Sequence, residues 1–171
     1  ALEHTDTLGT GSVLRPGDVP RMTAGRGIAH SEYNASTVEP LRLFQIWILP
    51  EKKRLPPGYQ EQHFSEDDRR GQLRLVASRD GRQGSLTIHQ DVNVYAGLLD
   101  DRTAGGLAGQ AVTLPLAAGR HAWVQVARGN LRLGDHVLGA GDGAAVSDEA
   151  SVILARVAGS PTAEVLVFDL A

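Results

Sequence analysis

Short apolar runs, many of them alternating with polar residues, recur along this chain of 171 residues and are separated by Gly-, Pro- and Asp-containing turns. The spacing, roughly 8 to 12 residues from one turn signal to the next, is typical of an all-β sandwich or barrel. We predict strands at 2–4, 12–15, 19–23, 28–33, 41–49, 73–77, 86–90, 92–99, 112–116, 121–127, 130–133, 143–146, 151–157 and 164–170.

The segment 41–49, LRLFQIWIL, is the most apolar of these predicted strands. Large apolar side chains fall on both of its faces, with Leu43 and Trp47 on one and Phe44 and Ile46 on the other. A strand that is apolar on both faces is usually covered on both sides. We therefore predict a buried strand here.

A charged, proline-rich stretch, PEKKRLPPGY at 50–59, interrupts the strand pattern and indicates a domain boundary. We divide the chain into an N-terminal domain at 1–50, a linker at 51–64 and a C-terminal domain at 65–171. The C-terminal domain opens on Ser65 and three acidic residues, the pattern of a capped helix N-terminus. Gly71 is expected to end this short helix.

An internal repeat relates the two domains. VLRPGDVPRM at 13–22 matches VLGAGDGAAV at 137–146 at a constant offset of 124 residues, which indicates two copies of one β-unit. The second copy is preceded by the strand-rich segment 112–129, and the first has no counterpart to it. We therefore expect the first barrel to lack its N-terminal strands and the chain to be part of a longer protein. A natural short form covered by a partner chain is the alternative.

Composition narrows the classes of function. A net charge of −3 argues against a nucleic-acid partner, because such proteins carry a basic face. No apolar run approaches the ~20 residues of a membrane helix, so no membrane partner is expected. The absence of cysteine excludes disulfides and thiolate metal sites and is compatible with the cytoplasm.

His30 and Glu32 are the candidate functional pair. Two residues apart on a predicted strand, their side chains leave the same face, where they could hold a metal ion or move a proton. The corresponding place in the second copy, Ser147-Asp148-Glu149, has no histidine. Imidazole with carboxylate suits iron, manganese, nickel, cobalt or zinc, but a metal site needs three or four ligands. A simple hydrogen-bonded pair is the structural alternative.

His4 could complete such a site if 2–4 is a neighbouring strand. The simpler interpretation is a histidine at the entry of a turn, bonded to the backbone. The remaining histidines show no ligand spacing and are interpreted as structural or exposed: His63, His89, His121 and His136.

MTAGRGIAHSE at 22–32, together with PGDV at 16–19, resembles the signature of the pirin family, two-domain members of the cupin superfamily. The resemblance continues through LRLFQIWILP, GSLTIHQD and VLVFDL, and the bacterial quercetinase-like members are the most similar. It implies an all-β fold of two cupin (double-stranded β-helix, or jelly-roll) barrels.

The resemblance also implies a metal in the N-terminal barrel, most often iron, with manganese, nickel, cobalt, zinc or copper as alternatives. Three histidines and one glutamate hold it in the family, and His30 and Glu32 match the last two ligands. The first two come from an H-x-H segment upstream of Ala1. We therefore expect this chain to bind metal weakly or not at all, unless another residue such as His4 completes the site.

The activity implied is that of a quercetin 2,3-dioxygenase, which opens a flavonol ring with O₂. The partners would be a small aromatic substrate and O₂, and Glu32 would be the catalytic acceptor of the substrate's hydroxyl proton. Other family members regulate transcription or metabolism by binding protein partners, with the metal as a switch. A non-catalytic regulator of that kind is the alternative function.

Overall fold

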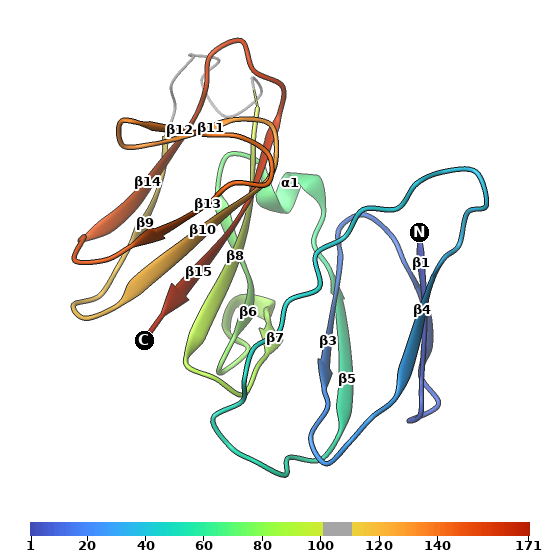
Figure 1. Cartoon of the computed structure of the whole chain (residues 1–171). Helices are drawn as coiled ribbons and strands as arrows, with labels where there is room; N and C mark the ends of the chain where they lie inside the picture. Colours follow the sequence, from blue (N-terminus) through green and yellow to red (C-terminus); the bar gives the residue numbers. More distant parts are fainter. Residues whose placement is uncertain (101–110) are drawn as a thin grey trace.

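The computed structural model of the chain describes residues 1–100 and 111–171. Strands make up nearly all of its regular structure, and Figure 1 shows them in two parts, a smaller one at residues 1–63 and a larger one that follows. The prediction of an all-β fold is therefore confirmed. No helix within the described residues is long and apolar enough to cross a membrane.

The N-terminal part contains two small antiparallel sheets. One has the order β2-β1-β4 and the other pairs β3 with β5. These strands are β1 (Leu2–Asp6), β2 (Gly11–Leu14), β3 (Asp18–Thr23), β4 (His30–Asn34) and β5 (Gly58–His63). Strand β5 lies inside the predicted linker 51–64, so the second half of that segment adds a strand to the N-terminal part.

The C-terminal part is a sandwich of a six-stranded sheet, β13-β10-β15-β8-β6-β7, and a four-stranded sheet, β12-β11-β14-β9. Its strands are β6 (Leu73–Ser78), β7 (Leu86–Thr87), β8 (Val92–Leu99), β9 (Ala111–Pro115), β10 (His121–Arg128), β11 (Leu131–Leu133), β12 (His136–Leu138), β13 (Gly143–Val146), β14 (Ser151–Arg156) and β15 (Ala163–Leu170). A short 3₁₀-helix, η1 (Arg82–Gly84), joins β6 to β7.

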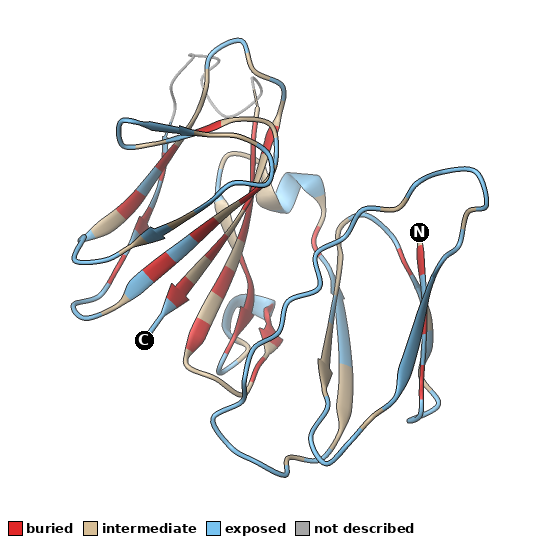
Figure 2. Cartoon of the chain, viewed as in Figure 1, coloured by how far each residue is buried: buried red, intermediate tan, exposed pale blue. Residues whose placement is uncertain are grey.

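Alternating side chains fill the sandwich (Figure 2). In β10 and β15 every second residue is buried, as a strand with one face on a core requires. The core combines both sheets, and Val124, Leu131, Val152, Leu154 and Val165 are fully buried in it. A second apolar cluster, which includes Phe64 and Val94, packs with Val19 of β3 and so joins the two parts of the molecule.

The helix prediction is confirmed. Helix α1 spans Glu66–Arg69, and Ser65 caps it with a reciprocal capping box. The Asp68 N–H donates to Ser65 Oγ at 3.2 Å, and the Ser65 N–H donates to the Asp68 carboxylate at 2.8 Å. The helix ends before Gly71, because Arg70 is already extended, with φ −74° and ψ 121°. The Gly71 N–H donates to the Leu98 carbonyl at 2.8 Å rather than to the helix, so the expectation that Gly71 ends the helix is wrong.

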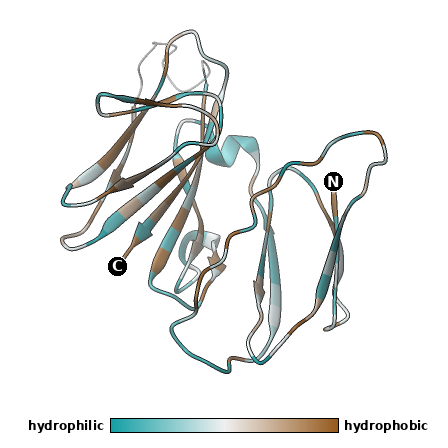
Figure 3. Cartoon of the chain, viewed as in Figure 1, coloured by the Kyte–Doolittle hydropathy of each residue, from teal (hydrophilic) through white to brown (hydrophobic). Residues whose placement is uncertain are grey.

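The prediction for 41–49 is wrong. This segment forms no strand, and no backbone-to-backbone hydrogen bond joins it to any described residue. Its apolar side chains are exposed, with Trp47 at 87% and Leu49 at 84%. Figure 3 shows this hydrophobic stretch in the strand-free loop from β4 to β5, which passes between the two parts. An apolar sequence favours a strand, but a strand also needs a neighbouring strand to complete its backbone hydrogen bonds. Within the described residues no strand is hydrogen-bonded to this segment, whose side chains instead line a cavity together with residues of β8, β10 and β15.

The repeat is visible in the backbone. Gly17 and Gly141, 124 residues apart, both have a φ of 97°. In each copy the following aspartate caps the same turn: Asp18 accepts from Arg15 N at 2.7 Å, and Asp142 accepts from Gly139 N at 2.8 Å. The sheet order β2-β1-β4 likewise recurs as β12-β11-β14. The two copies therefore share turn geometry as well as sequence.

Candidate metal centre

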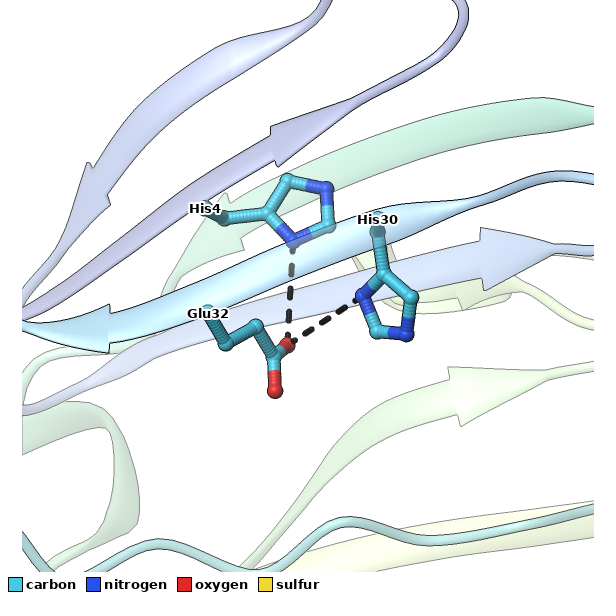
Figure 4. A group of neighbouring side chains, drawn as sticks. All are labelled: His4, His30 and Glu32. Atoms are coloured by element: carbon cyan, nitrogen blue, oxygen red, sulfur yellow. Dashed lines mark ion pairs between the residues drawn. The ribbon is translucent and has the colours of Figure 1, made fainter.

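The pairing of β1 with β4 creates the site. These strands are antiparallel, with His4 directly opposite Glu32 and Asp6 opposite His30. Directly opposed side chains on one face of a sheet lie close together. Figure 4 shows the side chains of His4, His30 and Glu32 converging from the two strands. Two histidines and one carboxylate therefore meet at one point, although 26 residues separate His4 from His30.

The distances fit a shared ion. Glu32 Oε1 lies 3.7 Å from His4 Nδ1 and 3.8 Å from His30 Nδ1, and one ligand atom from each residue lies within 4.8 Å of the others. Both distances exceed a hydrogen bond. Ligand atoms ~2.1 Å from a metal at tetrahedral angles would be about 3.4 Å apart. The two distances from Glu32 are within a few tenths of an ångström of this value, and small side-chain rotations would bring the two histidine nitrogens around one divalent ion.

A buried carboxylate supports His4 from behind. The Asp6 carboxylate lies 3.4 Å from His4 Nε2, and the backbone N–H groups of Leu8 and Thr10 donate to its other oxygen at 2.8 and 3.1 Å. Burial alone would raise the pKa of Asp6, but these two N–H donors and His4 hold it below its ordinary value. Because Asp6 lies beside Nε2 of His4, the other ring nitrogen, Nδ1, faces Glu32. Metal-binding histidines are usually supported in this way by a carboxylate on the nitrogen that does not bind the metal.

Tyr59 of β5 packs against the other side of the His4 ring. The two rings are stacked, with centroids 5.1 Å apart and planes 22° apart. The Tyr59 hydroxyl donates to Glu61 at 2.9 Å and contacts Ser12 Oγ at 3.0 Å. Burial, reinforced by Glu61, raises the pKa of Tyr59 to about 12. The phenol is therefore protonated at neutral pH and serves as a fixed wall of the site.

The site is open to solvent on one side only. The side chain of His4 is 3% exposed, whereas those of His30 and Glu32 are 28% and 27% exposed. A small molecule could therefore approach His30 and Glu32 while Tyr59 and Asp6 enclose His4. Two imidazoles and one carboxylate with free coordination positions are a donor set that divalent first-row metals accept.

His30 and Glu32 lie side by side as their spacing predicts, and their role as ligands stays a prediction. The interpretation of His4 as a turn-entry residue is wrong, because His4 lies inside β1 and faces Glu32. Leu2, His4 and Asp6 alternate on one buried face of β1, but the sequence did not show this face, because only Leu2 of the three is apolar. His63 and His121 lie elsewhere, bonded to Asp18 at 2.6 Å and Ser147 at 2.9 Å. Within the described residues, no other group of three such ligands converges.

Comparison with protein families identifies both parts of the chain. Residues 1–48 match the Pirin family model, and residues 75–170 match the model of the quercetinase C-terminal cupin domain. The second match covers most of the C-terminal sandwich, which is therefore a cupin domain.

Relatives match over nearly the whole chain. A quercetin 2,3-dioxygenase of Escherichia coli K12 is 37% identical over 169 residues, which cover 99% of this chain and 68% of that protein. The crystal structure of YhhW from E. coli superposes with a TM-score of 0.87 at 36% identity, and covers 99% of this chain and 67% of YhhW. A structure of the bacterial pirin YhhW in complex with nickel(II) has a TM-score of 0.84 at 37% identity over the same shares. On the evidence of both family models and these relatives, the chain belongs to the pirin family.

Proposed function

We propose that this protein is a metal-dependent dioxygenase of the quercetin 2,3-dioxygenase type, which opens the ring of a flavonol-like substrate with O₂. The convergence of His4, His30 and Glu32 on one point is the observation that carries the proposal. The relatives named as quercetin 2,3-dioxygenases support the substrate class.

A divalent metal is the proposed cofactor, with His4, His30 and Glu32 as its ligands. A relative bound to nickel(II) supports a divalent ion. Iron is our choice, because two histidines and one carboxylate with open positions are the donor set of non-haem Fe(II) oxygenases. When bound, the metal would supply a Lewis acid and a redox centre for O₂ chemistry.

The chain's own residues would bind the substrate and move its proton. Glu32 is the proposed acceptor of the flavonol hydroxyl proton, since its carboxylate is partly exposed beside His30. His4 is enclosed by Tyr59 and Asp6 and would keep the ligand geometry fixed while substrate enters from the His30 side. Holding substrate and acceptor in place lowers the entropic part of the barrier.

Oxygen consumption tests this proposal. The purified chain is loaded with Fe(II), or with Ni(II) in a parallel sample, and mixed with quercetin in air-saturated buffer. We expect O₂ uptake matched by loss of flavonol absorbance, with one O₂ consumed per ring opened. A Glu32→Gln variant is the matched control and should be inactive. Metal bound at one ion per chain without any ring-opened product would contradict the enzymatic function.

A non-catalytic role in binding a protein partner is the second candidate. The observation that favours it is the exposed apolar segment 41–49, because large exposed apolar patches often mark protein interaction sites. In that case metal would bind at His4, His30 and Glu32 without quercetin turnover. A change of metal would then alter partner binding rather than O₂ uptake, so the same assay separates the two functions.

A further inference from the structure

Gln45 contacts the Glu32 carboxylate from outside the two strands that form the site. It lies in the strand-free segment 41–49, and its side-chain Nε2 donates to Glu32 Oε2 at 3.3 Å. In the described part of the chain no other hydrogen bond reaches this carboxylate, because both histidine nitrogens lie beyond hydrogen-bond range of Oε1. Gln45 therefore holds one oxygen of Glu32 and leaves the other facing the histidines.

Trp47 sets the orientation of the Gln45 amide. The Trp47 indole N–H donates to Gln45 Oε1 at 3.2 Å. An indole nitrogen can only donate and a carboxylate can only accept, so a reversed amide would lose both hydrogen bonds. Trp47 and Glu32 therefore require the same orientation of the Gln45 amide, with its oxygen toward Trp47 and its nitrogen toward Glu32.

We propose that Gln45 is the positioning residue of the metal site and that Trp47 fixes its amide. This inference rests on the proposed metal site. By holding Glu32 Oε2, Gln45 makes Glu32 a ligand through Oε1 alone and lowers the entropy that the carboxylate loses when it binds an ion. Gln45 itself touches neither the metal nor the substrate in this arrangement. Partners of this outer kind are typically worth 10- to 100-fold in metal affinity.

The chain contains a matched control. Trp123 donates its indole N–H to Gln125 Oε1 at 3.4 Å, which reproduces the Trp–Gln pair on β10 of the C-terminal sandwich. There the Gln125 amide donates to the carbonyls of Gly141 and Asp142 instead of a carboxylate. Gln125 lines the same cavity as Gln45 and Trp47, but its hydrogen bonds go to backbone carbonyls and not to Glu32. A Gln125→Leu variant therefore changes the surroundings of Gln45 while it leaves the hydrogen bond to Glu32 in place.

Metal titration calorimetry with Ni(II) tests the inference. We expect Gln45→Leu to weaken binding about tenfold, Trp47→Phe to weaken it less, and Gln125→Leu to leave it unchanged. In the Co(II)-loaded protein, Gln45→Leu should also shift the visible ligand-field bands, because a released carboxylate can bind through both oxygens. Unchanged affinity and spectrum in Gln45→Leu would overturn the inference, as would an equal loss in Gln125→Leu.

A metal-free measurement separates this inference from the proposed function. In ¹H–¹⁵N spectra of the apo protein, Glu32→Ala and Trp47→Phe should each move the side-chain amide signals of Gln45. Unmoved signals would overturn the inference even if the wild type binds Ni(II). Absence of Ni(II) binding by the wild type would instead overturn the proposed metal site, and the positioning role with it.

Discussion

The two copies of the β-unit have the same strand order, but one carries candidate metal ligands where the other carries apolar core residues. Strand pairing aligns the two copies, because Leu133 lies opposite His136 and Leu154, just as His4 lies opposite Ser12 and Glu32. Val152, two residues before Leu154, then takes the position of His30, which corrects the match at 147–149. The C-terminal copy therefore has apolar side chains at all three positions that carry the candidate ligands in the N-terminal copy.

What covers each sheet explains the difference. In the C-terminal sandwich the six-stranded sheet packs over this face, and Val152 and Leu154 are fully buried. In the N-terminal part the face is only partly covered, with Tyr59 of β5 stacked on His4 and the other two site residues partly exposed. Polar ligands are tolerated where solvent reaches them, whereas unpaired polar groups inside a sandwich are destabilising. Two sheets with the same strand order can therefore differ in whether they carry candidate metal ligands.

The largest expected effect is on the stability of the C-terminal copy. Leu154→Ala should lower the free energy of unfolding by about 2–5 kcal/mol, because it leaves a cavity in a fully packed core. Glu32→Ala at the matching position should cost less stability, because the Glu32 side chain is 27% exposed. Urea denaturation of both variants makes the measurement. A larger loss for Glu32→Ala would break the comparison between the two copies.

The next effect concerns the ligand-bearing copy. Glu32→Gln should reduce Ni(II) affinity more than about 100-fold, because even outer partners of ligands are worth 10- to 100-fold, and it should abolish turnover. The free energy of unfolding without metal should change little, since the Glu32 side chain is partly exposed. Calorimetry and urea denaturation measure the two quantities. Retained turnover would remove Glu32 as the proton acceptor.

The repeated turn offers a sharper comparison. Gly17→Ala and Gly141→Ala both place a side chain at a φ of 97°, which costs about 1–2 kcal/mol. At Gly17 the new Cβ would also lie 2.8 Å from the Phe64 carbonyl oxygen, whereas at Gly141 nothing lies within 4 Å. Gly17→Ala should therefore lower the melting temperature more than Gly141→Ala. Equal shifts would indicate that the Phe64 backbone moves freely away.

The smallest effect is the acid sensitivity of the same turn. Burial works to raise the pKa of Asp18, but the Arg15 N–H and His63 outweigh it and the pKa lies below its ordinary value of 3.8. A depressed carboxyl pKa adds stability above the unfolded-state value, and this stability disappears as the pH falls through the folded-state value. The unfolding free energy of the wild type should therefore drop from pH 5 to pH 3 more steeply than that of Asp18→Asn. Parallel curves would assign the acid sensitivity to other carboxylates.

Interactions between residues close in sequence determined the strand content, the helix cap and the repeated turns, and the sequence alone predicts them. Turn residues and alternation predict the all-β fold, Ser65 and Asp68 predict the capping box, and the 124-residue repeat predicts matching turns at Gly17 and Gly141. The spacing of His30 and Glu32 also places them on one face of β4. These features depend on neighbours within a few residues, which the sequence displays directly.

Tertiary pairing alone decided the rest. His4 enters the site because the register of β1 on β4 sets it opposite Glu32, and a shift of one residue would turn it to the other face. Likewise, the apolar segment 41–49 is strand-like in composition but remains unpaired, because a strand exists only where another strand completes its hydrogen bonds. Register and partner are properties of segments distant in sequence, and only the folded chain brings those segments together.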